Sequence, residues 1–173
     1  MVFPRDTPKD AAIADAFNDA TRISGIVLAL ACLTELIMAN IIADFSAKTE
    51  AERNRLYTKI SEKASFDVKT ERLMRVLSEK SLHHTMQSYP DLKDRLDKLR
   101  KLRNRMAHSF PDTTDEYLAE KYHHRVRFVW YKHGRREYED ITWTDAQKRI
   151  HEAGELVLDV DTIRHEVGRF PPV

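Results

Sequence analysis

An uninterrupted apolar segment near the N-terminus constrains the fold of this chain more than any other feature. The segment from Ile23 to Phe45 reads ISGIVLALACLTELIMANIIADF, so apolar residues lie on nearly every side of the helix that it predicts. Such a helix has to be covered by the other helices of a bundle or by a second subunit. Because Glu35 and Asn40 interrupt the segment and no aromatic belt flanks it, we interpret it as a core helix without membrane contact.

The composition of the chain also favours long helices. Only 4 of 173 residues are glycine, and turns and strands are the elements that use glycine most. The 29 lysines and arginines nearly balance 28 acidic residues, so the net charge of +1 gives no evidence of a global attraction to nucleic acid. Cys32 is the only cysteine, which excludes an internal disulfide, and its apolar neighbours predict a buried thiol. The first ten residues contain no signal segment, so we expect a cytoplasmic protein.

The first two thirds of the chain are expected to be a helical bundle. Helix-start signals, each a capping residue or a proline, occur at Thr7, Thr49, Ser65 and Pro90. The first helix is expected to continue to about Phe45, whether or not it breaks near Ser24 and Gly25, and the last to end before Pro111. These signals predict four to five helices over residues 7–111.

The remainder of the chain predicts a β-hairpin and a final helix. Residues 125–144, RVRFVWYKHGRREYEDITWT, alternate apolar and polar side chains around a turn at His133 and Gly134. We therefore predict a hairpin over residues 124–144 with one apolar face, followed by a C-terminal helix over residues 145–168. No linker or repeat divides the chain, so the expected fold is a single, mainly α domain of residues 1–173.

The helix before Pro111 carries polar side chains in unexpected places. In a helix that turns about 100° per residue, Arg103 falls inside the apolar stripe centred on Leu99. Asn104 and His108 fall together near the opposite side, because they are four residues apart. Burying an arginine without a partner costs several kcal/mol, so Arg103 needs either a bound anion or an internal carboxylate.

The same helix has a local excess of positive charge. Residues 91–105 contain seven lysines and arginines against three aspartates, and the excess lies towards the C-terminal end. Four of these cations are candidates for binding RNA phosphates, namely Lys98, Arg100, Lys101 and Arg105. The alternative is a solvated helix face whose cations interact with the C-terminal end of the helix dipole.

Residues 103–109, RNRMAHS, resemble the signature of the HEPN superfamily, in which an arginine and an asparagine precede an alanine–histidine pair. The segment TRISGIVLALACLTELIMANII resembles the long apolar helix of that superfamily. The segment ASFDVKTERLMRVL resembles the helix that precedes its signature helix. The resemblance covers roughly residues 20–112 and is closest to the branch that includes the mannitol operon repressor family.

This resemblance implies a HEPN-like bundle that forms a homodimer, with the signature helices of both subunits lining one cleft. In active members the cleft is a metal-independent ribonuclease site, so Arg103, Asn104 and His108 are the implied catalytic residues, with RNA as substrate and no cofactor. An antitoxin or a regulatory protein is a further implied partner. Members paired with a nucleotidyltransferase antitoxin carry tyrosine two residues after the histidine, and Phe110 at this position argues against that pairing.

Three functions remain open on the sequence alone. The first is a homodimeric endoribonuclease of the toxin, stress or phage-defence kind. The second is a non-catalytic HEPN-like regulator that binds protein or nucleic acid, as the mannitol repressor branch implies, although the chain lacks a recognisable helix-turn-helix. The third is a helical dimerisation module in which Arg103 forms a structural ion pair with Glu35.

Adjacent histidines do not favour a metal site in this chain. His83 and His84, like His123 and His124, point about 100° apart if they are helical, so neither pair suits a shared ion. We expect these residues to lie in loops or at helix ends, and we predict no bound metal.

Overall fold

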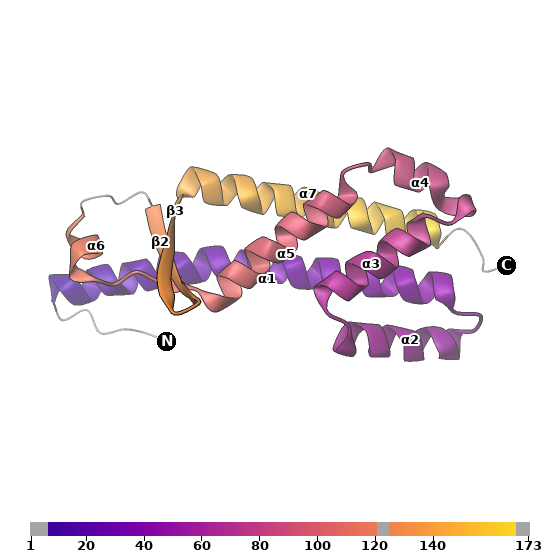
Figure 1. Cartoon of the computed structure of the whole chain (residues 1–173), viewed down its shortest axis with the longest axis horizontal. Coiled ribbons are helices and arrows are strands. Elements are labelled where there is room, and N and C mark those ends of the chain that lie inside the picture. Colours follow the sequence, from indigo (N-terminus) through magenta and orange to yellow (C-terminus); the bar gives the residue numbers. More distant parts are fainter. Residues whose placement is uncertain (1–6, 121–124, 169–173) are drawn as a thin grey trace. The chain divides into compact units, whose positions relative to one another are not determined.

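A computed structural model describes residues 7–120 and 125–168 of the chain. The fold is mainly helical, with a small antiparallel sheet of three strands and a C-terminal helix, as the sequence predicts (Figure 1). Its elements in chain order are α1 (Pro8–Ser46), α2 (Glu50–Lys63), α3 (Phe66–Leu77), η1 (Lys80–Leu82), α4 (His83–Ser88), α5 (Leu92–His108), β1 (Phe110–Pro111), α6 (Asp115–Ala119), β2 (Arg125–Lys132), β3 (Arg135–Thr142) and α7 (Trp143–Val167).

The contacts of the chain group it into two compact units. Unit 1 comprises Met1–Ala29 and Leu102–Glu152, and unit 2 comprises Leu30–Lys101 and Ala153–Val173. Helices α1, α5 and α7 each contribute one end to unit 1 and the other to unit 2. A single domain over residues 1–173 stays a prediction.

Helix α1 begins with the predicted cap and is continuous. The amide of Asp10 donates to Thr7 Oγ1 over 3.1 Å, and the amide of Thr7 donates to Asp10 Oδ2 over 3.1 Å. The helix does not break at Gly25. Among the described residues α1 is the one helix long and apolar enough to cross a membrane, and half of its most apolar stretch is buried. Core helices of soluble proteins pass the same test, so cytoplasmic location stays a prediction.

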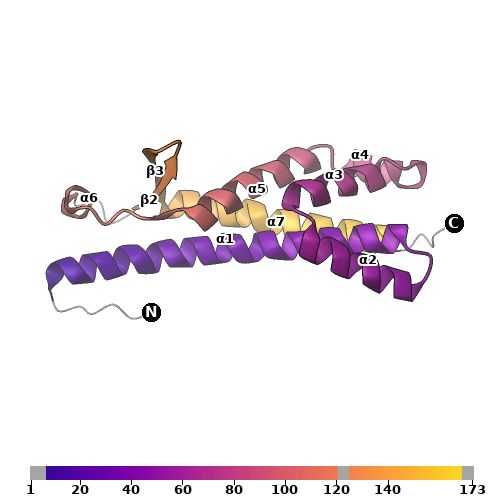
Figure 2. The same ribbon diagram turned by 60° about the horizontal axis from the view of Figure 1, so that its bottom comes forward.

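Unit 2 is built around apolar side chains from four helices. Its main core combines residues of α1, α3, α5 and α7, including Met38, Leu73, Leu96 and Val160, all without exposed surface. Helix α2 runs back along the C-terminal part of α1 (Figure 2) and packs Ile60 against it through a smaller cluster. As predicted, Thr49 caps α2: its Oγ1 accepts from the amide of Glu52 over 3.2 Å.

Within unit 2 the core covers one face of α1, so the interpretation that other helices surround this part of it is wrong, whereas cover by a second subunit stays a prediction. In unit 2 its buried face carries Ala31, Met38 and Ile41, whereas Leu33 and Leu36 are 45% and 42% exposed. Cys32 is also exposed, so the prediction of a buried thiol is wrong. The reason is that the core of unit 2 lines one face of the helix, and apolar residues on both faces hide that asymmetry in the sequence.

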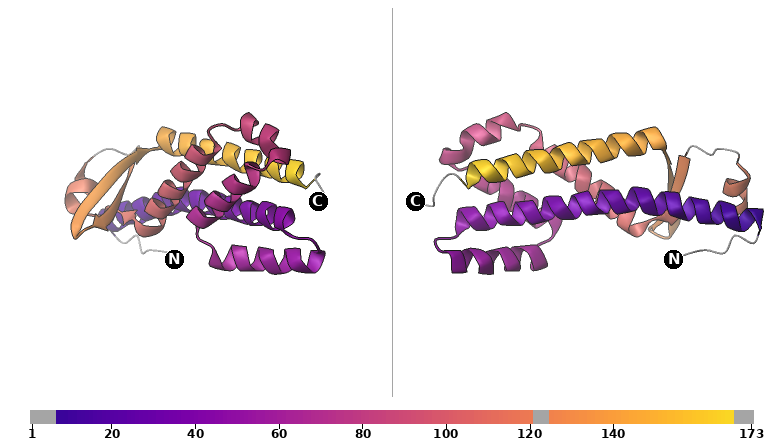
Figure 3. Two further views of the ribbon diagram at one scale, coloured as in Figure 1. Left: turned by 45° about the vertical axis from the view of Figure 1, so that its right-hand side comes forward. Right: turned by 180° about the vertical axis from the view of Figure 1, so that it is seen from behind.

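Unit 1 places the predicted hairpin on helices through its apolar face. Val126 and Phe128 of β2 and Ile141 of β3 are buried in one cluster with Ile23 of α1 and Met106 of α5. The turn at His133 and Gly134 has φ angles of 50° and 74°, as a two-residue hairpin turn requires. The paired strands are seen in the left view of Figure 3. The predicted hairpin extends to residue 124, which lies outside the described residues.

Short elements around the hairpin escaped the sequence analysis. Strand β1 adds to the sheet by pairing antiparallel with β2, with Phe110 opposite Val129 and Pro111 opposite Phe128. Helix α6 lies beside the N-terminal end of α1 (Figure 1), where Lys9 Nζ is 2.7 Å from Asp115 Oδ1. Both elements are too short to give a periodic pattern.

Candidate functional site

The signature residues occupy the C-terminal end of α5 in unit 1. Met106 is buried in the core of unit 1 and anchors this end of the helix; Ser24 Oγ lies 3.7 Å from its sulfur. Arg103 is half-buried, and its Nη1 donates to Asn104 Oδ1 over 3.0 Å. His108 is the last residue of α5, and its imidazole is exposed to solvent. The end of α5 therefore holds a cation close to the core and a histidine that a ligand can reach.

Arg103 and His108 leave α5 in different directions. They are five residues apart in the sequence, which corresponds to a rotation of about 140° around a helix. Asn104 lies between them in direction and is half-buried. One copy of α5 therefore turns the guanidinium and the imidazole towards different sides.

The four candidate phosphate-binding cations fall into two groups. Lys98 and Lys101, in unit 2, are exposed and make no ion pair with any of the described residues. Arg100, also in unit 2, has its Nε 2.7 Å from Asp67 Oδ1 and is less available. Arg105, in unit 1, donates to Glu139 and lies 5.1 Å from the ring centre of Trp130.

Glu139 of β3 links the end of α5 to the start of α7. Its carboxylate accepts from Arg105 and, over 2.8 Å, from Arg149 Nη2. Burial opposes the charged carboxylate, but the hydrogen bonds from Arg149 and Arg105 outweigh it and hold the pKa of Glu139 below its ordinary value. Arg105 therefore has a structural role in unit 1, whether or not it also contacts a ligand.

Glu35 has a specific partner within unit 2. Its Oε2 accepts from Lys69 Nζ over 2.7 Å, and the same ammonium lies 3.4 Å from the carbonyl oxygen of Ser61. Lys69 comes from α3 and is 3% exposed. Lys69 could not be recognised as part of a buried ion pair from the sequence, because it lies on an otherwise largely apolar face of a short helix. An ion pair between Glu35 and Arg103 joins residues of different units and stays a prediction.

The outward face of the sheet in unit 1 carries aromatic side chains that the sequence analysis did not assign to a site. Phe110, Val129 and Tyr138 lie side by side across the three strands, and Tyr131 is two residues further along β2. The rings of Phe110 and Tyr131 are stacked, with centres 6.3 Å apart and planes at 28°. The alternation of side chains along β2 could have placed Tyr131 on this face from the sequence. Phe110 could not be placed there, because it belongs to a strand of only two residues.

A polar network supports one end of this face. Arg127 lies between the rings of Tyr117 and Tyr138, with its guanidinium carbon 4.8 Å from each ring centre. Its Nε donates to Asp140 over 2.7 Å, and this bond raises the pKa of the guanidinium. Asp112 is 4% exposed, accepts from Thr114, and forms an ion pair with Arg136 in which Oδ1 and Nη2 are 2.8 Å apart. These contacts fix Tyr138 and Arg136 on the sheet.

Metal ligation is not indicated within the part of the chain that the structure describes. No group of three or more histidine, cysteine or acidic side chains is arranged there to hold an ion. His83 and His84 are exposed at the start of α4, whereas His123 and His124 lie outside the described residues. The expectation of no metal stays a prediction.

Comparisons with known proteins found no matching family model, no matching curated protein and no matching solved structure.

Proposed function

We propose that this protein is a homodimeric, metal-independent endoribonuclease of the HEPN type. The observation that carries the proposal is the placement of its signature: His108 is exposed at the last residue of α5, and Arg103 lies earlier on the same helix beside Asn104. The resemblance of RNRMAHS to the HEPN signature connects this placement to ribonuclease chemistry.

The residue types suit cleavage of RNA by its own 2′-hydroxyl. That reaction needs a base for the hydroxyl proton, an acid for the leaving 5′-oxygen and positive charge beside the phosphate. In this proposal one His108 acts as the base and the His108 of the second subunit acts as the acid. Arg103 supplies the planar, permanently charged group that pairs with phosphate oxygens, and Asn104 holds its guanidinium.

The directions of the two side chains favour a site shared between two copies of the chain. Arg103 and His108 diverge by about 140° on one helix, so a single copy presents them to different surroundings. A two-fold axis that passes between the two helix ends brings both His108 imidazoles to one cleft, with the Arg103 of each copy at its edge. The exposed cations Lys98 and Lys101 precede the signature in the sequence and are further candidates for contacts with RNA phosphates.

Cleavage of RNA in the presence of EDTA tests the proposal. We expect the wild-type protein to cut labelled single-stranded or structured RNA with the chelator present, and the variants Arg103→Ala and His108→Ala each to lose at least about 100-fold in rate. His84→Ala removes an exposed histidine elsewhere and serves as the matched control. Absence of cleavage of every RNA by the folded wild type at high concentration contradicts the proposal.

A HEPN-like regulator that binds without cutting is the second candidate. The bond between Arg103 and Asn104 and the pairing of Arg105 with Glu139 favour it, because these polar groups already satisfy one another. Its expected behaviour is salt-dependent RNA binding that weakens on neutralising Lys98 and Lys101, with the RNA recovered intact.

A further inference from the structure

The sheet of unit 1 has one buried face and one open face. Val126, Phe128 and Ile141 point into the core of unit 1, so the residues that alternate with them point outward. On that outward face Phe110 is 46% exposed, Tyr131 65% and Tyr138 61%. Burying such rings in the core is the normal outcome, so three large exposed rings on one small sheet need an explanation.

The three rings are held in place by the sheet beneath them. Phe110 and Tyr138 flank Val129, which has no exposed surface, so two strand spacings of about 4.8 Å each separate their backbones. Tyr131 stacks with Phe110, and Tyr138 lies over the guanidinium of Arg127. Each ring of this array therefore packs against a neighbouring side chain, while 46% to 65% of each residue stays exposed to solvent.

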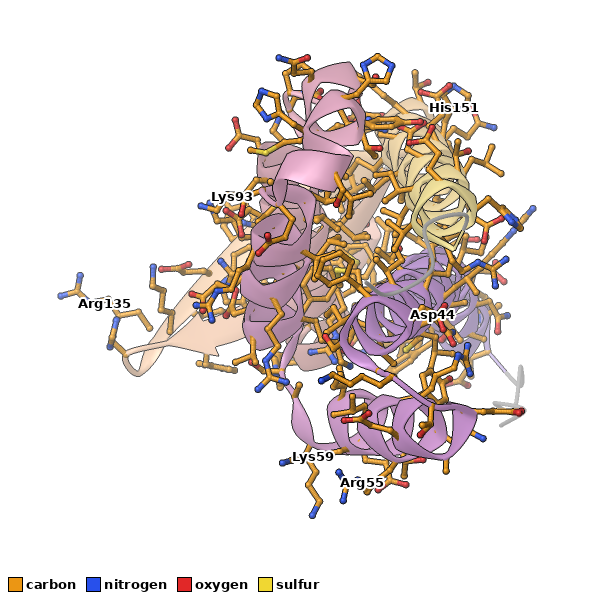
Figure 4. The ribbon with its side chains drawn as sticks, turned by 90° about the vertical axis from the view of Figure 1, so that its right-hand side faces the viewer. Asp44, Arg55, Lys59, Lys93, Arg135 and His151 are labelled. Carbon is orange, nitrogen blue, oxygen red and sulfur yellow. The ribbon has the colours of Figure 1, made fainter. Side chains whose placement is uncertain are left out.

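Positive charge is concentrated at the hairpin turn next to the array. Residues 131–138, YKHGRREY, contain Lys132, Arg135 and Arg136 against one acid, Glu137. Glu137, whose carboxylate accepts from the indole of Trp130, lies on the other face together with the facing pair Lys132 and Arg135. Arg136 lies opposite Tyr131 on the face of the rings, with its Nη2 2.8 Å from Asp112 Oδ1. Lys132 and Arg135 make no ion pair with the residues that the structure describes, and Figure 4 shows Arg135 projecting beyond the turn.

We propose that this face, defined by Phe110, Tyr131 and Tyr138, binds single-stranded RNA, with Arg136 on the face itself and Lys132 and Arg135 at the adjoining turn facing the phosphates. Unpaired bases stack on exposed aromatic rings whatever their sequence, and lysine and arginine beside the rings neutralise the backbone phosphates. A paired duplex hides the faces of its bases, so it does not suit the array. The positive charge of the adjoining turn favours this occupant over an apolar protein surface, which would leave Lys132 and Arg135 without partners.

The array is close in sequence to the candidate reactive histidine. Phe110 is two residues after His108, and both belong to unit 1. A strand stacked on the array therefore has its backbone near the exposed imidazole. In this respect the inference rests on the proposed ribonuclease function and adds to it that the substrate is unpaired RNA, selected by stacking.

Binding measured apart from cleavage tests the inference. Fluorescence anisotropy of labelled 12-nucleotide oligouridine and oligoadenosine, with the matching RNA duplex as competitor, is measured on the full chain carrying His108→Ala. In this background we expect Tyr131→Ala and Tyr138→Ala each to raise Kd roughly tenfold. Tyr131→Phe and Tyr138→Phe keep the rings and are expected to bind as the parent does.

A charge pair supplies a second, independent measurement. We expect Lys132→Gln with Arg135→Gln to reduce the slope of log Kd against log salt by about 1.4, or about 0.7 for each lost phosphate contact. Arg55→Gln with Lys59→Gln makes the same charge change on the exposed surface of α2 (Figure 4) and is expected to leave the slope closer to the parent value.

The outcomes separate this inference from the proposed function. Alanine variants that bind single strands as tightly as the parent, or a duplex that binds as tightly as a single strand, overturn the inference. The first of these results assigns the rings to a protein partner instead. If single strands bind through the rings but the wild type cuts no RNA, the nuclease proposal fails and the inference stands. If the wild type cuts RNA while the alanine variants bind and cut equally well, the inference fails and the nuclease proposal stands.

Discussion

Lys69 is a buried cation whose placement is explained by one carboxylate. An ammonium that is 3% exposed is costly to bury, and its bond of 2.7 Å to Glu35 together with the carbonyl of Ser61 provides the compensation. The sequence offered Glu35 as an internal partner for Arg103. It did not identify Lys69, because a lysine on a short amphipathic helix is read as solvent-exposed.

Replacement of Lys69 tests this ion pair. We expect Lys69→Met to lower the free energy of unfolding by about 3 kcal/mol, because the charge of Glu35 then loses its ammonium partner. The double variant Lys69→Met with Glu35→Gln is expected to recover part of the loss, and Lys63→Met, at an exposed position of α2, to change stability little. Urea denaturation measures all three variants. A Lys69→Met protein as stable as the wild type contradicts the assignment.

The candidate site shows which of its features the sequence pattern can predict and which it cannot. The spacing of Arg103, Asn104 and His108 and the end of their helix before Pro111 could be predicted from the sequence, because both depend on local periodicity. The pairing of Arg105 with Glu139 could not, since the two residues are 34 positions apart and meet only through the packing of the sheet. A basic run in the sequence thus overstates the charge available to a ligand.

At the scale of elements, the hairpin is specified by its turn. His133 and Gly134 both have positive φ, which matches the twist of the paired strands and favours glycine at the second position. The turn sets the register that places Tyr131 opposite Arg136 and leaves the rings on the outward face. Strand β1 has no such local signal, and it forms because its backbone pairs with the free edge of β2.

Two glycine substitutions are expected to have opposite effects. Gly134→Ala should lower the free energy of unfolding by about 1 kcal/mol, because alanine is strained at a φ of 74°, although nothing lies within 4 Å of the new methyl group. Gly154→Ala, with equally open space in the middle of α7, should raise it by roughly 0.5–1 kcal/mol. Thermal melts followed by circular dichroism measure both. Equal shifts in the two variants would count against the turn assignment.

At the scale of the whole molecule, the proposed site depends on a second copy of the chain. Three helices contribute to both units, and the signature lies on one of them, α5. The proposed chemistry draws its acid and its base from two copies of His108. A dimer with only one functional His108 therefore lacks half of the proton transfer.

Mixed dimers test this dependence. We expect a dimer of one wild-type chain and one His108→Ala chain, purified through two different tags, to cut RNA roughly 100-fold more slowly than the wild type. A mixed dimer with His84→Ala serves as the control and should stay active. Half or more of the wild-type rate in the His108 mixed dimer shows that each copy holds a complete site. Light scattering that finds a single chain at assay concentration contradicts the dimer itself.

The sequence alone determined what depends on near neighbours. The caps at Thr7 and Thr49, the end of α5 and the hairpin turn at Gly134 follow from hydrogen bonds and backbone preferences within a few residues. Only the tertiary structure decided which side of the apolar helix α1 is buried, which acid holds Lys69, and that Phe110 joins Tyr131 and Tyr138 on one open face. Those outcomes depend on packing between distant segments, and periodicity shows that a face is apolar but not what covers it.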